Sequence, residues 1–194
     1  MITRSTEFSR PPVLIGYTYD PEEAYKARDD NRLLAIRLET NRSCNLRCRY
    51  CYAEGGEGLP DELDYDHLAD LVTQAYDLGA RSVVVIGGGE PTLHPRFRDL
   101  ISHIASLGMI PMVFTNMTTI TADLAAFLHQ NNASIMGKLD SLRPPVQDFF
   151  AGMTGAFDLM QRGLQNLIDA GFTEPDDPRE LRLGVSFVSN RMNL

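Results

Sequence analysis

The sequence predicts an α/β protein in which about five parallel strands alternate with four to five helices. Runs of β-branched and apolar residues, of which SVVVI at 82–86 is the clearest, have the composition of buried strands. Apolar residues at helical spacing lie between these runs. Regular alternation of the two patterns is typical of a parallel sheet covered by helices, either an open sheet or an incomplete barrel.

The elements follow one another from residue 33. Residues 1–32 are polar and form a predicted N-terminal extension with a short strand at 13–17, and residues 33–194 form the predicted core. We expect strands at 33–38, 82–86, 110–115, 134–139 and 181–188. We expect helices at 66–78, 95–107, 121–128 and 156–170.

Capping residues support the predicted helix ends. Gly79 and Gly171 stand where helices commonly end in a left-handed residue. Pro95 suits the first position of a helix, because that position needs no backbone N–H. Thr121 can accept a hydrogen bond as an N-cap residue.

Composition narrows the class of protein. The formal net charge is −8, which argues against a large contact with nucleic acid, because such a contact needs clustered Lys and Arg. No apolar run approaches the length of a membrane span, and the first ten residues have no apolar signal core. We therefore expect a cytoplasmic protein that contacts neither nucleic acid nor membrane.

The three cysteines are the most informative residues. Cys44, Cys48 and Cys51 have the spacing C-x3-C-x2-C and follow the first core strand. Their odd number and clustering favour a metal centre over a disulfide framework. Thiolates are the ligands of iron–sulfur clusters, and three of them would leave one iron of a [4Fe–4S] cluster open. A zinc site completed by His67 or His94, or three inert packing cysteines, are the alternatives.

A glycine-rich turn follows the second core strand. It reads Gly87-Gly88-Gly89-Glu90-Pro91-Thr92, and its glycines permit close approach of the backbone to a ligand. Taken alone, it could be only a tight connection between a strand and a helix. In parallel α/β folds, active sites gather at this edge of the sheet, where the cysteine segment also lies.

The two motifs together resemble those of the radical S-adenosylmethionine (SAM) superfamily. The family carries C-x3-C-x-aromatic-C after the first strand of a partial (β/α)6 barrel, and Tyr50 occupies the aromatic position here. It carries Gly-Gly-Glu after the second strand, which Gly88, Gly89 and Glu90 match. The resemblance implies that the cysteines hold a [4Fe–4S] cluster and that the turn receives the amino group of SAM.

Weaker matches extend the resemblance along the chain. Thr115 and Asn116 end the third core strand, where relatives often place Thr-Asn toward the cofactor. Lys138 and Asp140 end a segment that looks like the fourth strand of the SPASM and twitch group, and Ser186 lies on the strand expected beside the adenosine. A structural ion pair, solvated strand ends and sheet packing are the alternative roles. The chain also looks truncated before the sixth barrel strand.

The resemblance implies a reaction and its partners. Reductive cleavage of SAM would give a 5′-deoxyadenosyl radical, which abstracts hydrogen from a substrate. An electron donor such as flavodoxin or ferredoxin would reduce the cluster, and a peptide or protein is favoured over a small molecule as substrate. A structural metal-binding module and a catalytically inactive interaction module are the alternatives. The arginines at 42, 47 and 49 could contact substrate or only balance charge.

Overall fold

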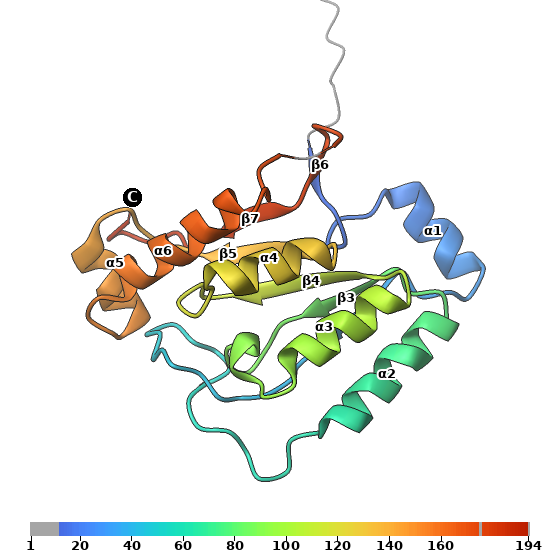
Figure 1. Ribbon diagram of the computed structural model, residues 1–194, viewed down its shortest axis with the longest axis horizontal. Helices are drawn as coiled ribbons and strands as arrows, with labels where there is room; N and C mark the ends of the chain where they lie inside the picture. The colour runs from blue at the N-terminus through green and yellow to red at the C-terminus, as the bar shows by residue number, and fades with distance from the viewer. Residues whose placement is uncertain (1–11, 175, 194) are drawn as a thin grey trace, which may run out of the picture.

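A computed structural model describes residues 12–174 and 176–193. Five parallel strands form one sheet in the order β2-β3-β4-β5-β7, and a two-stranded pair, β1-β6, lies beside it (Figure 1). The strands are β1 (Val13–Leu14), β2 (Ala35–Leu38), β3 (Ser82–Val85), β4 (Ile110–Thr115), β5 (Ser134–Lys138), β6 (Glu180–Leu181) and β7 (Leu183–Ser186). The helices are α1 (Pro21–Asp29), α2 (Tyr65–Asp77), α3 (Phe97–Ser106), α4 (Ala122–Gln130), α5 (Pro144–Ala151) and α6 (Ala156–Asp169), with a 3-10 turn η1 (Pro91–Leu93). The predicted α/β fold class is confirmed.

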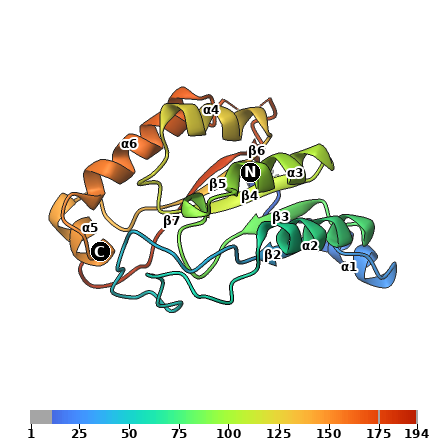
Figure 2. The same cartoon turned by 60° about the horizontal axis from the view of Figure 1, so that its bottom comes forward.

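Helices α2, α3, α4 and α6 cover one face of this sheet (Figure 2). Alternate strand residues point to that face, among them Val83 and Val85 on β3, and pack in the main apolar core with Leu100 and Ile104 of α3. Side chains of a strand alternate between the two faces of a sheet. The intervening residues therefore line the inner face, which the helices leave uncovered.

The buried part of the inner face is formed by apolar side chains. Val84 and Met112 form a buried cluster with Leu14 of β1, and Ile86, Phe114 and Met136 pack against it. The register pairs Val84 with Met112 and Phe114 with Met136, so these side chains form successive layers from the amino ends of the strands toward their carboxyl ends. This face forms the floor of the site described below.

The predicted capping residues are confirmed at three helices, α2, α4 and α6. Thr121 Oγ1 accepts from Leu124 N at 3.1 Å, as expected for the N-cap of α4. Gly79 has φ of 92° and Gly171 has φ of 94°, the left-handed backbone that glycine adopts without steric cost. Helix α3 begins at Phe97 rather than Pro95, because the η1 turn occupies Pro91–Leu93 and Arg96 is the N-cap.

Several elements differ from the expected ones. The described residues form six helices, and α1 and α5 had no counterpart among the predicted elements. The strand expected over 181–188 is divided into β6 and β7, and it ends at Ser186. The strand expected at 13–17 is only Val13–Leu14, which pairs in parallel with β6. Expectations for residues 1–11 lie outside the described residues.

The N-terminal segment is attached to the core through side chains. The hydroxyl group of Tyr19 donates to Leu34 O at 3.0 Å and lies 2.7 Å from Ser82 Oγ. The ring of Tyr17 lies 5.3 Å from the ring of Phe114, centroid to centroid. Residues before β2 therefore complete the inner face rather than lie apart from it. Along the described residues, no helix combines the length and apolar character that a membrane crossing needs.

Candidate functional site

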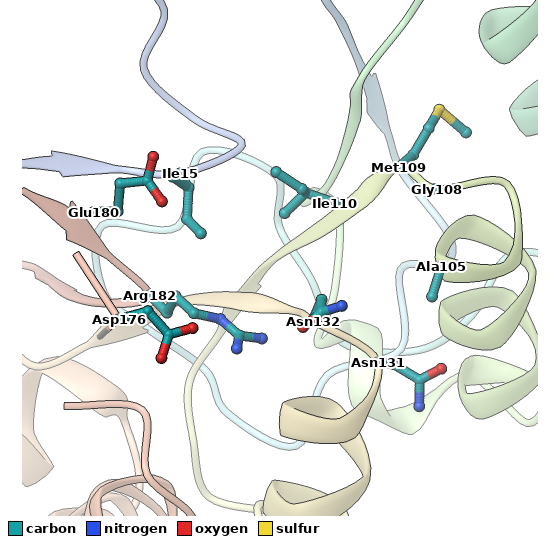
Figure 3. A pocket seen from close by; sticks show the side chains of 10 residues that line it. All are labelled: Ile15, Ala105, Gly108, Met109, Ile110, Asn131, Asn132, Asp176, Glu180 and Arg182. Atoms are coloured by element: carbon teal, nitrogen blue, oxygen red, sulfur yellow. The ribbon is translucent and has the colours of Figure 1, made fainter. Parts of the chain in front are cut away.

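A cavity of about 230 Å³ lies at the carboxyl ends of the strands. Its wall contains nearly every predicted site residue: Cys44, Cys48, Tyr50, Cys51, Gly88, Gly89, Glu90, Thr115, Asn116, Lys138 and Ser186. Asp140 is the predicted residue that does not line it. The apolar floor is formed by Ile86, Phe114 and Met136. Another cavity, about 300 Å³, lies at the amino ends of the strands beside Ile110 and Arg182, and none of the thiols lines it (Figure 3).

The cysteine loop is closed by backbone pairing at its two ends. Cys44 N donates to Gly56 O and Gly56 N donates to Arg42 O, each at 2.9 Å. Within the loop, Cys51 N donates to Cys48 O at 3.0 Å. The side chain of Leu46 is 1% exposed and anchors the loop in the main core. A closed, anchored loop holds the three thiols on one wall of the cavity.

Helix α5 supports this loop from outside. Arg47 N donates to Ala151 O and Arg49 N donates to Phe150 O, each at 3.0 Å. Gly152 is the C-cap of α5 with φ of 67°, and a Cβ atom there would overlap Arg47 O. Sequence reasoning missed this helix. Its signals are the two prolines at 144 and 145, apolar residues at 146, 149 and 150, and the closing glycine.

The three arginines near the cysteines brace the loop. The guanidinium group of Arg42 donates to Ala53 O, and that of Arg47 donates to Cys44 O at 2.7 Å. Arg49 Nε donates to Phe149 O at 3.0 Å, and the guanidinium group stacks over the Phe149 ring. Each of the three guanidinium groups therefore holds a backbone carbonyl of the loop or of α5.

The electrostatic surroundings disfavour free thiolates. Burial raises the pKa of the Cys48 thiol to about 11, and the neighbouring Cys44 and Cys51 add to the effect. Burial, followed by the charges of Glu90 and Cys51, raises the pKa of Cys44. The three thiols line the same cavity, which is why their charges affect one another. Metal ions bind the thiolate form, so a cationic group in this place would offset both burial and repulsion.

The glycine turn lies directly against the cysteine segment. Gly89 N donates to Asn41 O at 2.9 Å, and Glu90 N donates to Ser43 O at 2.8 Å. A Cβ atom on Gly89 would overlap Ser43 O. A residue with a side chain at this position would therefore separate the two motifs.

Glu90 is buried behind the turn rather than extended into the cavity. It is 2% exposed, and its Oε1 accepts from the hydroxyl groups of Thr92 and Thr115, each at 2.7 Å. Its Oε2 accepts from Asn116 N at 2.7 Å. Burial raises the pKa of this carboxyl group, although these hydrogen bonds act in the opposite direction. Glu90 thus connects the glycine turn to the end of β4.

A ring of hydrogen bonds then joins β4 to the cysteine loop. Asn116 Nδ2 donates to Asn45 Oδ1 at 3.0 Å, and Asn45 Nδ2 donates to Thr118 Oγ1 at 2.7 Å. Thr118 Oγ1 in turn donates to Asn116 Oδ1 at 2.7 Å. Met117, between them, has φ of 64° and is fully buried, so this corner adopts one strained conformation. Nothing in the residue pattern indicates this ring, because its members are distant in sequence.

Asp140 anchors the loop on its other side. Its carboxylate accepts from the hydroxyl group of Tyr50, from Lys138 Nζ at 2.6 Å and from Val188 N at 2.7 Å. The ion pair between Lys138 and Asp140, which the sequence analysis gave as an alternative role, is therefore present, and Lys138 Nζ lies 5.0 Å from the Tyr50 ring centroid. Burial raises the pKa of the Tyr50 hydroxyl group, and its bond to Asp140 raises it further.

Two of the cysteines face a second, outer groove. Cys48 and Cys51 line it together with Arg47, Glu54 and Glu57, and its volume is about 460 Å³. The cysteine loop is therefore a thin wall between this groove and the inner cavity.

The histidines of the zinc alternative lie elsewhere. His67 Nδ1 lies 2.7 Å from Asp64 Oδ1 on the exposed start of α2, and His94 Nδ1 accepts from Arg96 N. Neither histidine lines the cavity or the outer groove. Within residues 12–174 and 176–193, no three His, Cys, Asp or Glu side chains converge on a single ion. A cluster makes a different demand, because each ligand meets a separate iron atom.

The residues present fit an iron–sulfur cluster and a small ligand beside it. Three free thiols line one cavity, and soft thiolate donors suit iron–sulfur clusters. Next to them, the glycine turn leaves backbone exposed where any side chain would overlap its neighbours.

Comparison with known proteins agrees with this geometry. The family model described as "Radical SAM superfamily" matches residues 38–175. The Fe-coproporphyrin III synthase of Methanosarcina barkeri is 29% identical over 91% of this chain and 45% of its own length. The mycofactocin maturase MftC of Mycobacterium tuberculosis is 32% identical over 72% of this chain and 35% of its own. The chain thus spans less than half the length of these enzymes.

Solved structures share the fold. Streptococcus suis SuiB bound to precursor peptide SuiA has a TM-score of 0.65 and 19% identity, over 77% of this chain and 35% of SuiB. The anSMEcpe structure with bound AdoMet and the Cp18Cys peptide has a TM-score of 0.62 and 19% identity, over 78% of this chain and 42% of its own.

Proposed function

Because this chain belongs to the radical SAM superfamily, we propose that Cys44, Cys48 and Cys51 hold a [4Fe–4S] cluster and that SAM binds beside it. The observation that carries the proposal is the shared cavity, in which all three thiols face the glycine turn and the polar end of β4. When bound, the reduced cluster supplies the electron that cleaves SAM to methionine and a 5′-deoxyadenosyl radical, which abstracts hydrogen from substrate.

The chain's own residues position these groups. The backbone of Gly88 and Gly89 offers polar groups to the amino-acid end of SAM, and Asn116, Lys138 and Ser186 offer polar atoms around the rest of the wall. Glu90 acts as a positioning residue, because its carboxylate oxygens already accept from protein donors. Asp140 holds Tyr50 and Lys138 in place from outside the cavity.

The apolar floor has its own role. Ile86, Phe114 and Met136 cover the deep side of the cavity with apolar side chains, which have no polar groups to bind water. Exclusion of water protects a reactive intermediate from side reactions. The substrate would approach over this floor.

A peptide or protein is the proposed substrate. Mycofactocin maturase and the peptide complexes of SuiB and anSMEcpe support it by relationship. The cavity supports it by chemistry, since its lysine, Lys138, is already paired with Asp140 and the floor is apolar. A tetrapyrrole with several carboxylates, the alternative that the coproporphyrin synthase favours, would need unpaired cations.

We propose that the electron donor docks at the outer groove. Cys48 and Cys51 line it, so a flavodoxin or ferredoxin docked there could reduce the cluster without entering the SAM cavity. We also propose a core of the SPASM and twitch type, which the segment at 134–190 resembles. The expected cytoplasmic location stays a prediction.

The first test is anaerobic reconstitution of the full chain with iron and sulfide. We expect about four iron atoms per chain. Single changes of Cys44, Cys48 or Cys51 to Ala should prevent this uptake, whereas Ser102→Ala, a change of similar size on the exposed side of α3, should not. Iron uptake that survives loss of any one cysteine would contradict the proposed ligand set.

Substrate class needs a separate experiment. The reconstituted protein with SAM and reductant is incubated with a library of short peptides and, in parallel, with an iron coproporphyrin. Formation of 5′-deoxyadenosine that rises with peptides supports the peptide assignment. A rise with the tetrapyrrole alone would replace it. An inactive interaction module would bind cluster and SAM but form no 5′-deoxyadenosine with either.

A further inference from the structure

Glu39 is a carboxylate that no part of the sequence reasoning considered. It follows β2 directly, two residues after Arg37, which pairs in register with the inner-face residue Val84. Side chains two residues apart in extended backbone lie on the same face. Glu39 is therefore an exposed side chain on the inner face, at the carboxyl end of an edge strand.

Its side chain lies against the glycine turn. A Cβ atom on Gly87 would lie 2.7 Å from Glu39 Cγ, and one on Gly88 would overlap Glu39 Oε1. Gly87 and Gly88 both line the cavity. Glu39 is not itself a lining residue, but its carboxylate lies against these two glycines and therefore beside the proposed cofactor site.

This carboxylate is unpaired. Within the described parts of the chain, neither oxygen of Glu39 has a hydrogen-bond or ion-pair partner. Two other acidic side chains beside the cavity are engaged, since Glu90 accepts from Thr92, Thr115 and Asn116, and Asp140 accepts from three donors. Glu39 has no such partners and remains available to a ligand.

The position of Glu39 beside the cavity determines which part of a bound SAM it would contact. A Cβ atom on Gly55 would overlap Gly88 O and lie 3.4 Å from Cys44 Cβ. Gly55 therefore lies against both Gly88 and the first cysteine of the loop, and Gly88 in turn lies against Glu39. The carboxylate therefore lies at the end of the cavity where the proposed function places the amino-acid end of SAM.

We propose that Glu39, and not Glu90, accepts a hydrogen bond from the amino group of SAM. The inference rests on the proposed function and adds a binding residue to it. In this arrangement, a carboxylate oxygen of Glu39 would accept one N–H of the amino group. Glu90 acts only through the backbone that it positions.

The test measures the affinity of the reconstituted full chain for two ligands. SAM and S-adenosylhomocysteine share the amino group, but only SAM carries the sulfonium charge. Glu39→Gln keeps the size of the side chain and removes its charge, so we expect Kd to rise about tenfold for both ligands. Glu180→Gln makes the same change on an exposed glutamate at the opposite end of the strands and should leave both values unchanged (Figure 3).

Each other outcome has one meaning. Affinities are compared at equal iron content per chain, which separates SAM binding from cluster loading. A higher Kd for SAM alone would place Glu39 against the sulfonium and overturn the assignment. Unchanged Kd values for both ligands would overturn it as well. If the wild-type chain binds neither ligand, the proposed function itself fails and the inference falls with it.

Discussion

The side-chain amide group of Asn116 donates to the side-chain oxygen of Asn45 across 3.0 Å, which joins the end of β4 to the residue after the first cysteine. The backbone N–H of Asn116 also donates to Glu90 Oε2. One chain of hydrogen bonds therefore runs from the glycine turn through β4 to the cysteine loop. Its geometry couples the place where SAM is proposed to bind to the cysteine loop that is proposed to hold the cluster.

Thr118 completes this hydrogen-bond network, and its hydroxyl group can be removed with almost no change in the shape of the side chain. Thr118→Val removes the hydroxyl group that bonds both Asn45 and Asn116, and we expect faster loss of the cluster to an iron chelator and about 1 kcal/mol less stability. Thr118→Ser keeps the hydroxyl group and should behave as wild type. The measurement is the decay of cluster absorbance under anaerobic conditions. Equal decay rates for the two variants would show that the ring does not hold the loop.

Glu90 is the second residue at which a substitution would break this hydrogen-bond network. In Glu90→Gln, one carboxylate oxygen becomes an NH₂ group, which donates and does not accept. The single remaining oxygen cannot serve both Thr115 and Asn116 N, so a buried donor loses its partner. We expect a loss of about 1–3 kcal/mol in the free energy of unfolding, measured with urea. Glu174→Gln, on an exposed side chain, is the control. A stability equal to that of the control would refute the role given to this carboxylate.

Gly89 tests the contact between the two motifs. In Gly89→Ala, the added methyl group would overlap Ser43 O and separate the turn from the cysteine segment, so iron uptake should fall sharply. Gly184→Ala is the matched change on β7, where the nearest atom is the flexible Met136 Sδ at 3.2 Å, and it should reconstitute nearly as wild type. Normal iron uptake by the Gly89 variant would show that the motifs need no direct contact.

The start of α2 gives a prediction that depends on pH. The hydrogen bond to Asp64 raises the pKa of His67 in the folded protein. A raised folded pKa means that the bond stabilises the fold below the unfolded pKa and that this contribution is lost as the pH rises through the folded pKa. The melting temperature of wild type should therefore exceed that of His67→Gln at about pH 5.5 and approach it by about pH 8.5. A difference that stays constant or grows with pH would contradict the assignment.

Sequence reasoning predicted the core of the fold because its signals are local. SVVVI at 82–86 and the spacing of apolar residues at 97–104 each specify one element, and the observed β3 and α3 follow them closely. The cysteines and the glycine turn were recognisable because ligand spacing and glycine content are also local. The alternation of the elements then placed both motifs at the same end of the sheet.

What the sequence could not show depends on contacts between distant residues. Helix α5 is short, and its role is visible only when Arg47 and Arg49 are found bonded to its last turn. The sequence motif indicates Glu90 and not Glu39 as a ligand-binding carboxylate, but burial and hydrogen bonding show that Glu90 is engaged and Glu39 is not. The ring of Asn45, Asn116 and Thr118 joins loops that are more than 70 residues apart.

The central claim is an open iron that SAM can reach from the cavity. The most direct measurement is EPR spectroscopy of the reconstituted, reduced chain with and without SAM. We expect the signal of a [4Fe–4S]⁺ cluster, and we expect SAM to change its shape, because a ligand at the open iron alters the cluster's electronic structure. A cluster signal that stays the same with saturating SAM, or no cluster at all, would contradict the account.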